Sequence, residues 1–257
     1  MLAAVESGNA KELAELMRQD PGFDVNMGLD DSGSTLLHFA CEGSDSRSAV
    51  IPLLLAHPDI DVNGKTRYGS TPFIWACVNG RTSCVRLLLE DSRVNPNEPG
   101  NDRSTPLRYA AYFGHVDVIK WWIVSGREMD LGKPGDVYKT DAIGAAKGQG
   151  KTEVVSLLER FKENPDDTRR HVRQEMGWYD ALAAEMFALV VFVSDGLLQI
   201  KETNTTTTPA ARFFSIVARL PLELQMVLCY RLVGSYKEII SGKESEVAFK
   251  ELARKLW

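Results

Sequence analysis

The sequence predicts an all-α protein made largely of stacked helix pairs, because a short motif recurs four times and a second apolar cluster follows each copy. The copies are STLLHFAC from Ser34, STPFIWAC from Ser70, STPLRYAA from Ser104 and KTDAIGAA from Lys139. Their threonines, Thr35, Thr71, Thr105 and Thr140, lie 36, 34 and 35 residues apart. A period of this length predicts one supersecondary unit per copy, which buries its apolar surface only by stacking on its neighbours.

Each copy predicts two helices. The threonine is a good N-cap, and Pro72 and Pro106 follow at a position where proline is tolerated. Gly80 and Gly114 are expected to end the first helix in a left-handed conformation. The second helix carries the apolar cluster, which is IPLLL ending at Leu55, VRLLL ending at Leu89, VIKWWI ending at Ile123 and VVSLL ending at Leu158. Trp122 is expected to be buried, and the pairs Val25–Asn26, Val62–Asn63 and Val94–Asn95 are expected to close three units with turns.

These motifs resemble the ankyrin repeat family, whose consensus T-P-L-H-x-A is nearly met by TPLRYAA, TPFIWAC and TLLHFAC. The resemblance covers about residues 2–162 and implies about five repeats in a solenoid over residues 1–162. The first repeat runs from Ala4 through Asn26. The fifth is degenerate, with Asp141 in the proline position, and is expected to act as a cap. The family implies a non-catalytic module that binds a protein partner on its concave face.

In ankyrin proteins the concave face consists of the turn tips and the exposed end of each first helix. By repeat position, the resemblance implies a protein-binding set of Arg67, Tyr68, Ser70, Val78, Asn79, Asn101, Asp102, Ser104, Tyr112, Phe113, Lys139 and Lys147. It also selects Asp31, Ser32, Ser34 and Glu42 in the second repeat, and Asp136 and Val137 in the fifth. Tyr68, Tyr112 and Phe113 are the strongest candidates, because aromatic side chains dominate interface energetics.

Residues 163–257 are expected to form a separate helical domain. The charged segment around Pro165 is expected to end the repeats, and a long helix that breaks near Gly177 should follow. A polar stretch predicts a mobile loop at about 201–208. The segment LPLELQMVLCYRL, at about 220–232, weakly resembles an F-box. That resemblance implies an alternative function, a substrate-recruiting adaptor of a ubiquitin ligase.

A second alternative comes from AAKGQGKT, Ala145–Thr152, which fits a relaxed Walker A pattern for nucleotide binding. A phosphate loop needs a preceding strand and amides aimed at the phosphates, whereas this segment lies between two expected ankyrin helices. We therefore favour a loop within the fifth repeat. His38 and Cys41 share a helical face and Cys77 lies near Cys84, but packing explains these positions better than a metal site. We expect no catalytic residue, metal or cofactor.

Composition narrows the partner classes. The chain has 257 residues, a formal net charge of −5 and no basic stripe, so nucleic acid is not an expected partner. The longest apolar run, Met186–Val193, is too short to span a membrane. Four cysteines without a C-x-x-C pair and an N-terminus without a signal pattern favour reduced thiols in the cytoplasm or nucleus. We expect a monomer.

Overall fold

A computed structural model describes residues 1–132, 140–194, 213, 217, 219–233, 240 and 242–256 of the chain, and these residues form helices and no β-strand. The chain divides into two compact units, Met1–Val172 and Arg173–Trp257. The first unit therefore extends ten residues beyond the sequence-based limit of 162. The expected loop at about 201–208 lies outside the described residues.

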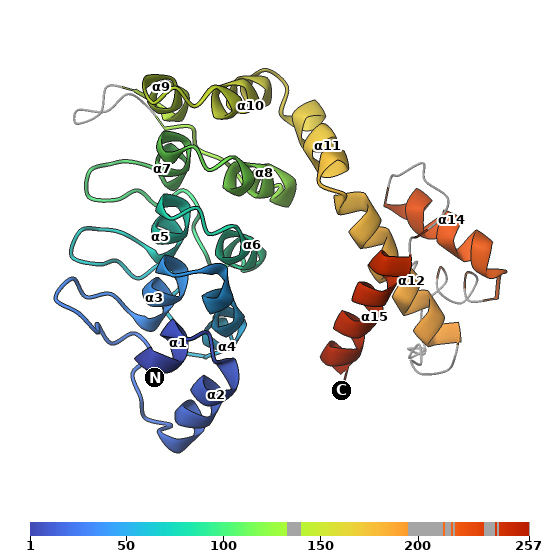
Figure 1. Cartoon of the computed structure of the whole chain (residues 1–257), viewed down its shortest axis with the longest axis horizontal. Helices are drawn as coiled ribbons and strands as arrows, with labels where there is room; N and C mark the ends of the chain where they lie inside the picture. The colour runs from blue at the N-terminus through green and yellow to red at the C-terminus, as the bar shows by residue number, and fades with distance from the viewer. Residues whose placement is uncertain are drawn as a thin grey trace, which may run out of the picture. The chain divides into compact units, whose positions relative to one another are not determined.

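The first unit contains five successive helix pairs. They are α1 (Leu2–Glu6) with α2 (Ala10–Gln19), α3 (Leu36–Glu42) with α4 (Ile51–Leu55), α5 (Pro72–Val78) with α6 (Thr82–Glu90), α7 (Pro106–Phe113) with α8 (Val116–Ser125), and α9 (Ala142–Gly148) with α10 (Thr152–Glu163). A 3₁₀ helix, η1 (Asp45–Val50), precedes α4. Figure 1 shows the first helices stacked in one row, the second helices in another, and the long turns projecting from the first row.

The first helices start where the sequence predicts, with one correction. The side-chain oxygens of Thr71 and Thr105 accept hydrogen bonds from the amides of Ile74 and Arg108, three residues on. In the fifth repeat the same bond, from Gly144 N, goes to Asp141 and not to Thr140. Asp141 is thus the N-cap and does not take the proline position. The fifth motif is therefore shifted by one residue relative to the alignment on Thr140.

The same short loop joins the two helices in four of the five repeats and confirms this register. Each loop contains a left-handed glycine, Gly8, Gly80, Gly114 or Gly150. The residue after that glycine donates its amide to an alanine carbonyl of the first helix, pairing Asn9 with Ala4, Arg81 with Ala76, His115 with Ala110 and Lys151 with Ala146. Ala146 is therefore the counterpart of Ala110 and Ala76.

Asparagine side chains link the turns of neighbouring repeats. The Asn26 side chain donates to Asp59 O and accepts from Asp61 N, and the Asn63 side chain donates to Arg93 O and accepts from Asn95 N. The third link is made by Asn97, which bonds Glu128 O and Asp130 N. The counterpart of Val25–Asn26 and Val62–Asn63 is therefore Pro96–Asn97, and the prediction of Val94–Asn95 is wrong by two residues.

Two buried polar contacts tie the repeat core together. Trp122 is fully buried, as predicted; its ring meets Phe73 edge to face at 5.1 Å, and Nε1 donates to Glu128 O. His38 lies between two repeats, where its Nδ1 accepts from Thr35 N and its Nε2–H donates to Ser70 O. These bonds suit a neutral imidazole, and burial lowers the pKa of His38 below its ordinary value.

Helix α11 (Pro165–Glu175) begins at Pro165, within the charged segment that is expected to end the repeats, and Asn164 caps it by accepting from Asp167 N. Gly177, with a positive φ, follows α11, as expected for a break.

The second unit contains α12 (Trp178–Ser194), α14 (Leu222–Leu232) and α15 (Gly242–Leu256), which share an apolar core that includes Phe187 and Tyr230. Among the described helices no single one is long and apolar enough to cross a membrane, and only the bent pair α11–α12 reaches that length.

Candidate protein-binding face

Partly buried aromatic side chains mark one face of the first-helix row. Phe39 of α3, Trp75 of α5 and Tyr109 of α7 occupy the same position, four residues after the N-cap threonine. Trp75 meets Phe39 edge to face at 6.3 Å. The Tyr109 hydroxyl donates to the Asp102 carboxylate at 2.7 Å, which fixes its ring beside the turn of its own repeat. We call this surface, with the exposed ends of the first helices, the first-helix face.

A pocket of about 220 Å³ opens on this face across three repeats. Its walls come from α3, α5 and α7 and from the turn before α5, and its lining residues are Glu42, Ser70, Ile74, Trp75, Val78, Asn79 and Tyr109. Ser70, Val78, Asn79 and Glu42 were selected from the sequence, and the structure brings these four together. The Asn79 side chain donates to Trp75 O, so it caps α5 as well as lining the pocket.

Tyr112 and Phe113 end α7 on the first-helix side, where 38% and 45% of their surfaces are exposed. Their rings meet edge to face at 5.1 Å, and Phe113 also stacks on His115 at 6.0 Å. His115 in turn bonds Val78 O of the preceding repeat. Tyr112 is therefore the freer contact residue, whereas Phe113 also supports a link between repeats.

The turn tips form the other border of the face. Tyr68 is 70% exposed, and Arg67 and Asn101 are exposed beside it. The tips are joined by backbone bonds from Arg67 N to Ser32 O and from Asn101 N to Tyr68 O, and the Asn101 side chain donates to Arg67 O. These bonds hold Tyr68 at a fixed position although its side chain projects into solvent.

Several selected residues do not present a side chain to a partner. Ser34 and Ser104 are buried, so their selection as contact residues is a correction. The Ser104 hydroxyl accepts from Arg108, while Asp102 holds the Tyr109 hydroxyl and the Ser104 amide. Ser32 bonds Asp30 within its turn, whereas Asp31 is exposed and remains a contact candidate. Lys139, Asp136 and Val137 lie outside the described residues.

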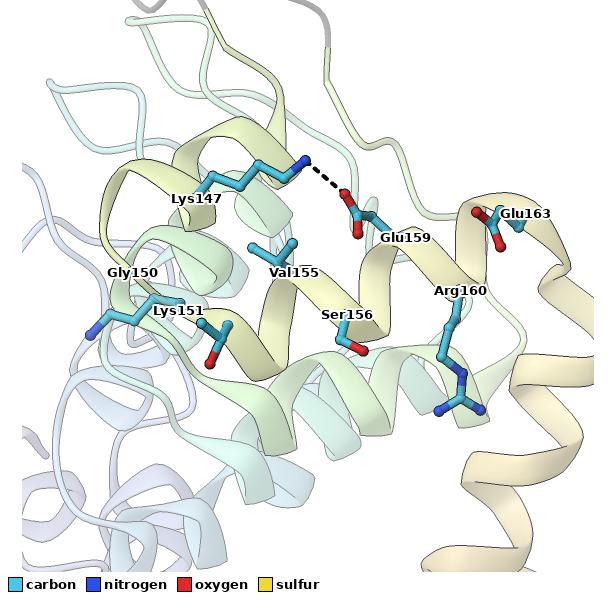
Figure 2. Close-up of a pocket in the computed structure, with 9 residues that line it drawn as sticks. Lys147, Gly150, Lys151, Val155, Ser156, Glu159, Arg160 and Glu163 are labelled. Carbon is cyan, nitrogen blue, oxygen red and sulfur yellow. Dashed lines mark ion pairs between the residues drawn. The ribbon is translucent and has the colours of Figure 1, made fainter.

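Lys147 lies on a different surface, the outer face of the last repeat. With the fifth motif shifted by one residue, Lys147 is the counterpart of the buried residues Cys77 and Ala111. It forms an ion pair of 2.7 Å with Glu159 of α10, beside an open hollow of about 420 Å³ (Figure 2). Glu159 in turn stands where the inner repeats have Leu89 and Ile123. The fifth repeat thus carries a charged pair at positions that are apolar in the repeats stacked inside the row.

The Walker-A-like segment forms the ordinary loop between α9 and α10. The amides of Gly150, Lys151 and Thr152 donate to the carbonyls of Lys147, Ala146 and Gly150. The Lys151 side chain crosses Gly114 of the preceding repeat and points away from the Lys147–Glu159 pair (Figure 2). With its amides occupied by the protein, this loop gives no support to the nucleotide-binding alternative.

The four cysteines are buried. Burial raises the pKa of the Cys77 thiol well above its ordinary value and that of Cys229 to about 11, and contact with Cys84 and burial raise the pKa of Cys41. A raised pKa keeps the thiols of Cys41, Cys77 and Cys229 protonated and poorly reactive at neutral pH. Among the described residues, no group of three or more histidine, cysteine, aspartate or glutamate side chains is placed to hold a metal ion.

Comparison with known proteins agrees with the repeat architecture. A family model of ankyrin repeats in three copies matches residues 1–99 and 46–133, which together cover just over half of the chain. The chain is 37% identical over 113 residues to alpha-latrotoxin-Lg1a of Latrodectus geometricus, a match that covers 44% of this chain and 8% of the toxin. It is 36% identical over 94 residues to human SMC5-SMC6 complex localization factor protein 1, a match that covers 37% of this chain and 9% of that protein. It is 26% identical over 142 residues to the mouse serine/threonine-protein kinase TNNI3K, a match that covers 52% of this chain and 17% of the kinase.

The chain belongs to the ankyrin-repeat family, and its repeat domain is a protein–protein interaction module. The matched stretch is less than a fifth of each of these relatives, so their names describe those proteins as wholes. The F-box-like segment forms helix α14, with Leu224 and Leu232 exposed, and the family match does not reach it. The comparisons therefore give no support to the adaptor alternative.

Proposed function

We propose that this chain is a non-catalytic recognition protein that binds a protein partner on the first-helix face of its ankyrin repeats. The observation that carries the proposal is the run of aromatic side chains across three repeats, from Phe39 through Trp75 to Tyr109, with Tyr112 and Phe113 beside them. Aromatic side chains that are partly exposed and held by neighbours supply large contact area at low entropic cost.

The repeats supply the rigidity that such a surface needs. The bonds between turns and the asparagine links fix each repeat against the next, so the contact residues are ordered before binding. A pre-ordered surface loses less conformational entropy on association, which favours affinity. In this respect the face is suited to recognition without any chemical step.

The test is a pull-down from a cell extract with quantitative mass spectrometry. The baits are the full chain, the triple variant Tyr68→Ala, Tyr112→Ala and Phe113→Ala, the single variant Trp75→Leu in the middle of the aromatic run, and the control Trp121→Ala. Trp121 is a half-buried aromatic residue of α8, on the second-helix row, where Arg86 lies over its ring. The control therefore removes aromatic area from the other side of the stack.

We expect a defined set of proteins to be lost from the triple variant or from Trp75→Leu and kept by Trp121→Ala. The triple variant should melt only slightly below the full chain, because Phe113 also stacks on His115. Retention of the same proteins by both the triple variant and Trp75→Leu would place the binding surface elsewhere and refute the proposal. Loss of the same proteins from the control as well would show that general destabilisation, and not a contact on this face, explains the result.

A further inference from the structure

The pocket on the first-helix face has a size and lining that limit what it can bind. Its volume of about 220 Å³ lies below the range of about 300–1,000 Å³ typical of small-molecule sites. At roughly 30 Å³ per water molecule it would hold about seven waters, which is the scale of one side chain. It therefore suits one residue of a protein partner better than a cofactor.

The lining combines apolar, aromatic and acidic groups. Ile74 and Val78 supply an aliphatic wall, and Trp75 and Tyr109 supply aromatic rings. Glu42, the last residue of α3, is the one formally charged residue among those that line the pocket. Glu42 is exposed and its carboxylate has no ion-pair partner among the described residues. The side chain of Arg81 donates to the backbone carbonyl of Glu42.

We propose, on the basis of the function proposed above, that this pocket binds an arginine side chain of the protein partner. An arginine stem packs along aliphatic surface while its guanidinium stays polar. A planar guanidinium stacks on aromatic rings such as those of Trp75 and Tyr109, and it forms forked hydrogen bonds with a carboxylate such as that of Glu42. The lining supplies each of these three contacts within one pocket.

Other occupants fit this lining less well. An acidic side chain would face the Glu42 carboxylate and find no cation among the lining residues. An aliphatic side chain would bury part of the carboxylate and of the polar Ser70 and Asn79 without pairing them, which costs free energy. A lysine would pair with Glu42 but stacks less well on the rings.

The experiment is a selection of random short peptides displayed on phage against the immobilised full chain, run in parallel on variants. Glu42→Lys reverses the charge of the pocket. Glu90→Lys is the matched control, because Glu90 is the exposed last residue of α6, on the second-helix row. Trp75→Leu keeps an apolar side chain but removes the large ring. Circular dichroism confirms that each variant is folded.

We expect peptides enriched on the unaltered chain to share an arginine at one aligned position. That preference should persist on Glu90→Lys, weaken on Trp75→Leu, and be replaced by aspartate or glutamate on Glu42→Lys. For one enriched peptide, changing its arginine to glutamine should lower affinity about tenfold on the unaltered chain and by a clearly smaller factor on Glu42→Gln, where only the stacking contacts remain to be lost. This double-mutant comparison isolates the contact between the two groups.

The outcomes separate the two proposals. Enriched peptides that are lost on Trp75→Leu but share only apolar or acidic residues would refute the arginine assignment and leave the binding face in place. An arginine preference that is unchanged on Glu42→Lys would refute the assignment too. A selection that enriches no peptide dependent on this face would contradict the proposed function and the arginine assignment together.

Discussion

Replacing Asn63 by alanine should weaken the stack at the link between the turns of the second and third repeats. The Asn63 side chain donates to Arg93 O at 2.8 Å and accepts from Asn95 N at 2.7 Å. A hydrogen bond contributes about 0.5–1.5 kcal/mol net, so the loss of both corresponds to roughly 1–3 kcal/mol. Asn63 is half-buried, so water can partly replace these bonds, and we expect a cost of about 2 kcal/mol.

Asn95→Ala is the matched control, because the Asn95 side chain bonds only within its own turn. It accepts from Asn97 N and donates to Glu98. The substitution keeps the Asn95 backbone amide that Asn63 binds, so the link between repeats survives. We expect a cost of about 0.5–1 kcal/mol for these exposed local bonds.

Urea unfolding followed by circular dichroism measures both variants. With a slope of about 2 kcal/mol/M, the Asn63→Ala midpoint should fall by about 1 M for the transition of the repeats, with an unchanged slope. Hydrogen exchange should show loss of protection at the Asn95 amide in Asn63→Ala only. Equal costs for the two variants, or a protected Asn95 amide in Asn63→Ala, would refute the assignment of the link to Asn63.

Three further predictions concern the core and the end of the stack. Burial lowers the pKa of His38 below 6.5, so the unfolded chain binds more protons and stability should fall as the pH drops below about 6.5; a titration of urea midpoints should show a weaker dependence in His38→Gln, which keeps a donor and an acceptor. Trp122→Phe removes buried area and the bond to Glu128 O and should cost about 2 kcal/mol in the same urea assay, and a cost near zero would contradict the packing described. The double variant Lys147→Ala and Glu159→Leu gives the last repeat the apolar character of the inner repeats and should self-associate in analytical ultracentrifugation. The single variant Lys147→Ala should sediment as the unaltered chain does.

The repeated motif was enough to predict the helix pairs, since the same few residues perform the same local task in each copy. Thr71 and Thr105 cap helices, and Gly80 and Gly114 adopt positive φ, wherever the stack places them. Such features depend on local backbone chemistry and are therefore readable from sequence.

The two misplaced assignments arise where neighbouring residues are chemically able to do the same task. Asp141 caps a helix as well as threonine does, so a match to the letter T at Thr140 chose the wrong register by one residue. Asn95 and Asn97 both lie in one turn, and the position of the next repeat's backbone determines which of the two side chains forms the link. The first error concerns a cap within one repeat, where two neighbouring residues are both good N-caps. The second concerns a contact between repeats, which no single repeat's sequence contains.

The aromatic positions Phe39, Trp75 and Tyr109 were visible in the sequence but were not selected. All three stand four residues after their threonine, in STLLHFAC, STPFIWAC and STPLRYAA. The repeat position of Tyr112 and Phe113, at the exposed end of a first helix, favours those two residues, because side chains in the middle of a short helix usually belong to the core. The signal that could have identified them is the recurrence of large aromatic side chains at a position where the consensus allows any residue.

The division between constant and variable positions indicates where partner specificity lies. The caps, the loop glycines and the asparagine links recur because each repeat needs them to fold and stack, so they carry no information about a partner. Glu42, Val78 and Tyr112 are aligned with one another by the register of the first helices, yet they differ in charge, size and aromatic character. Side chains that the stack does not constrain are free to match a ligand. Exchanging them between repeats should therefore change what is bound while leaving the stability of the stack nearly unaltered.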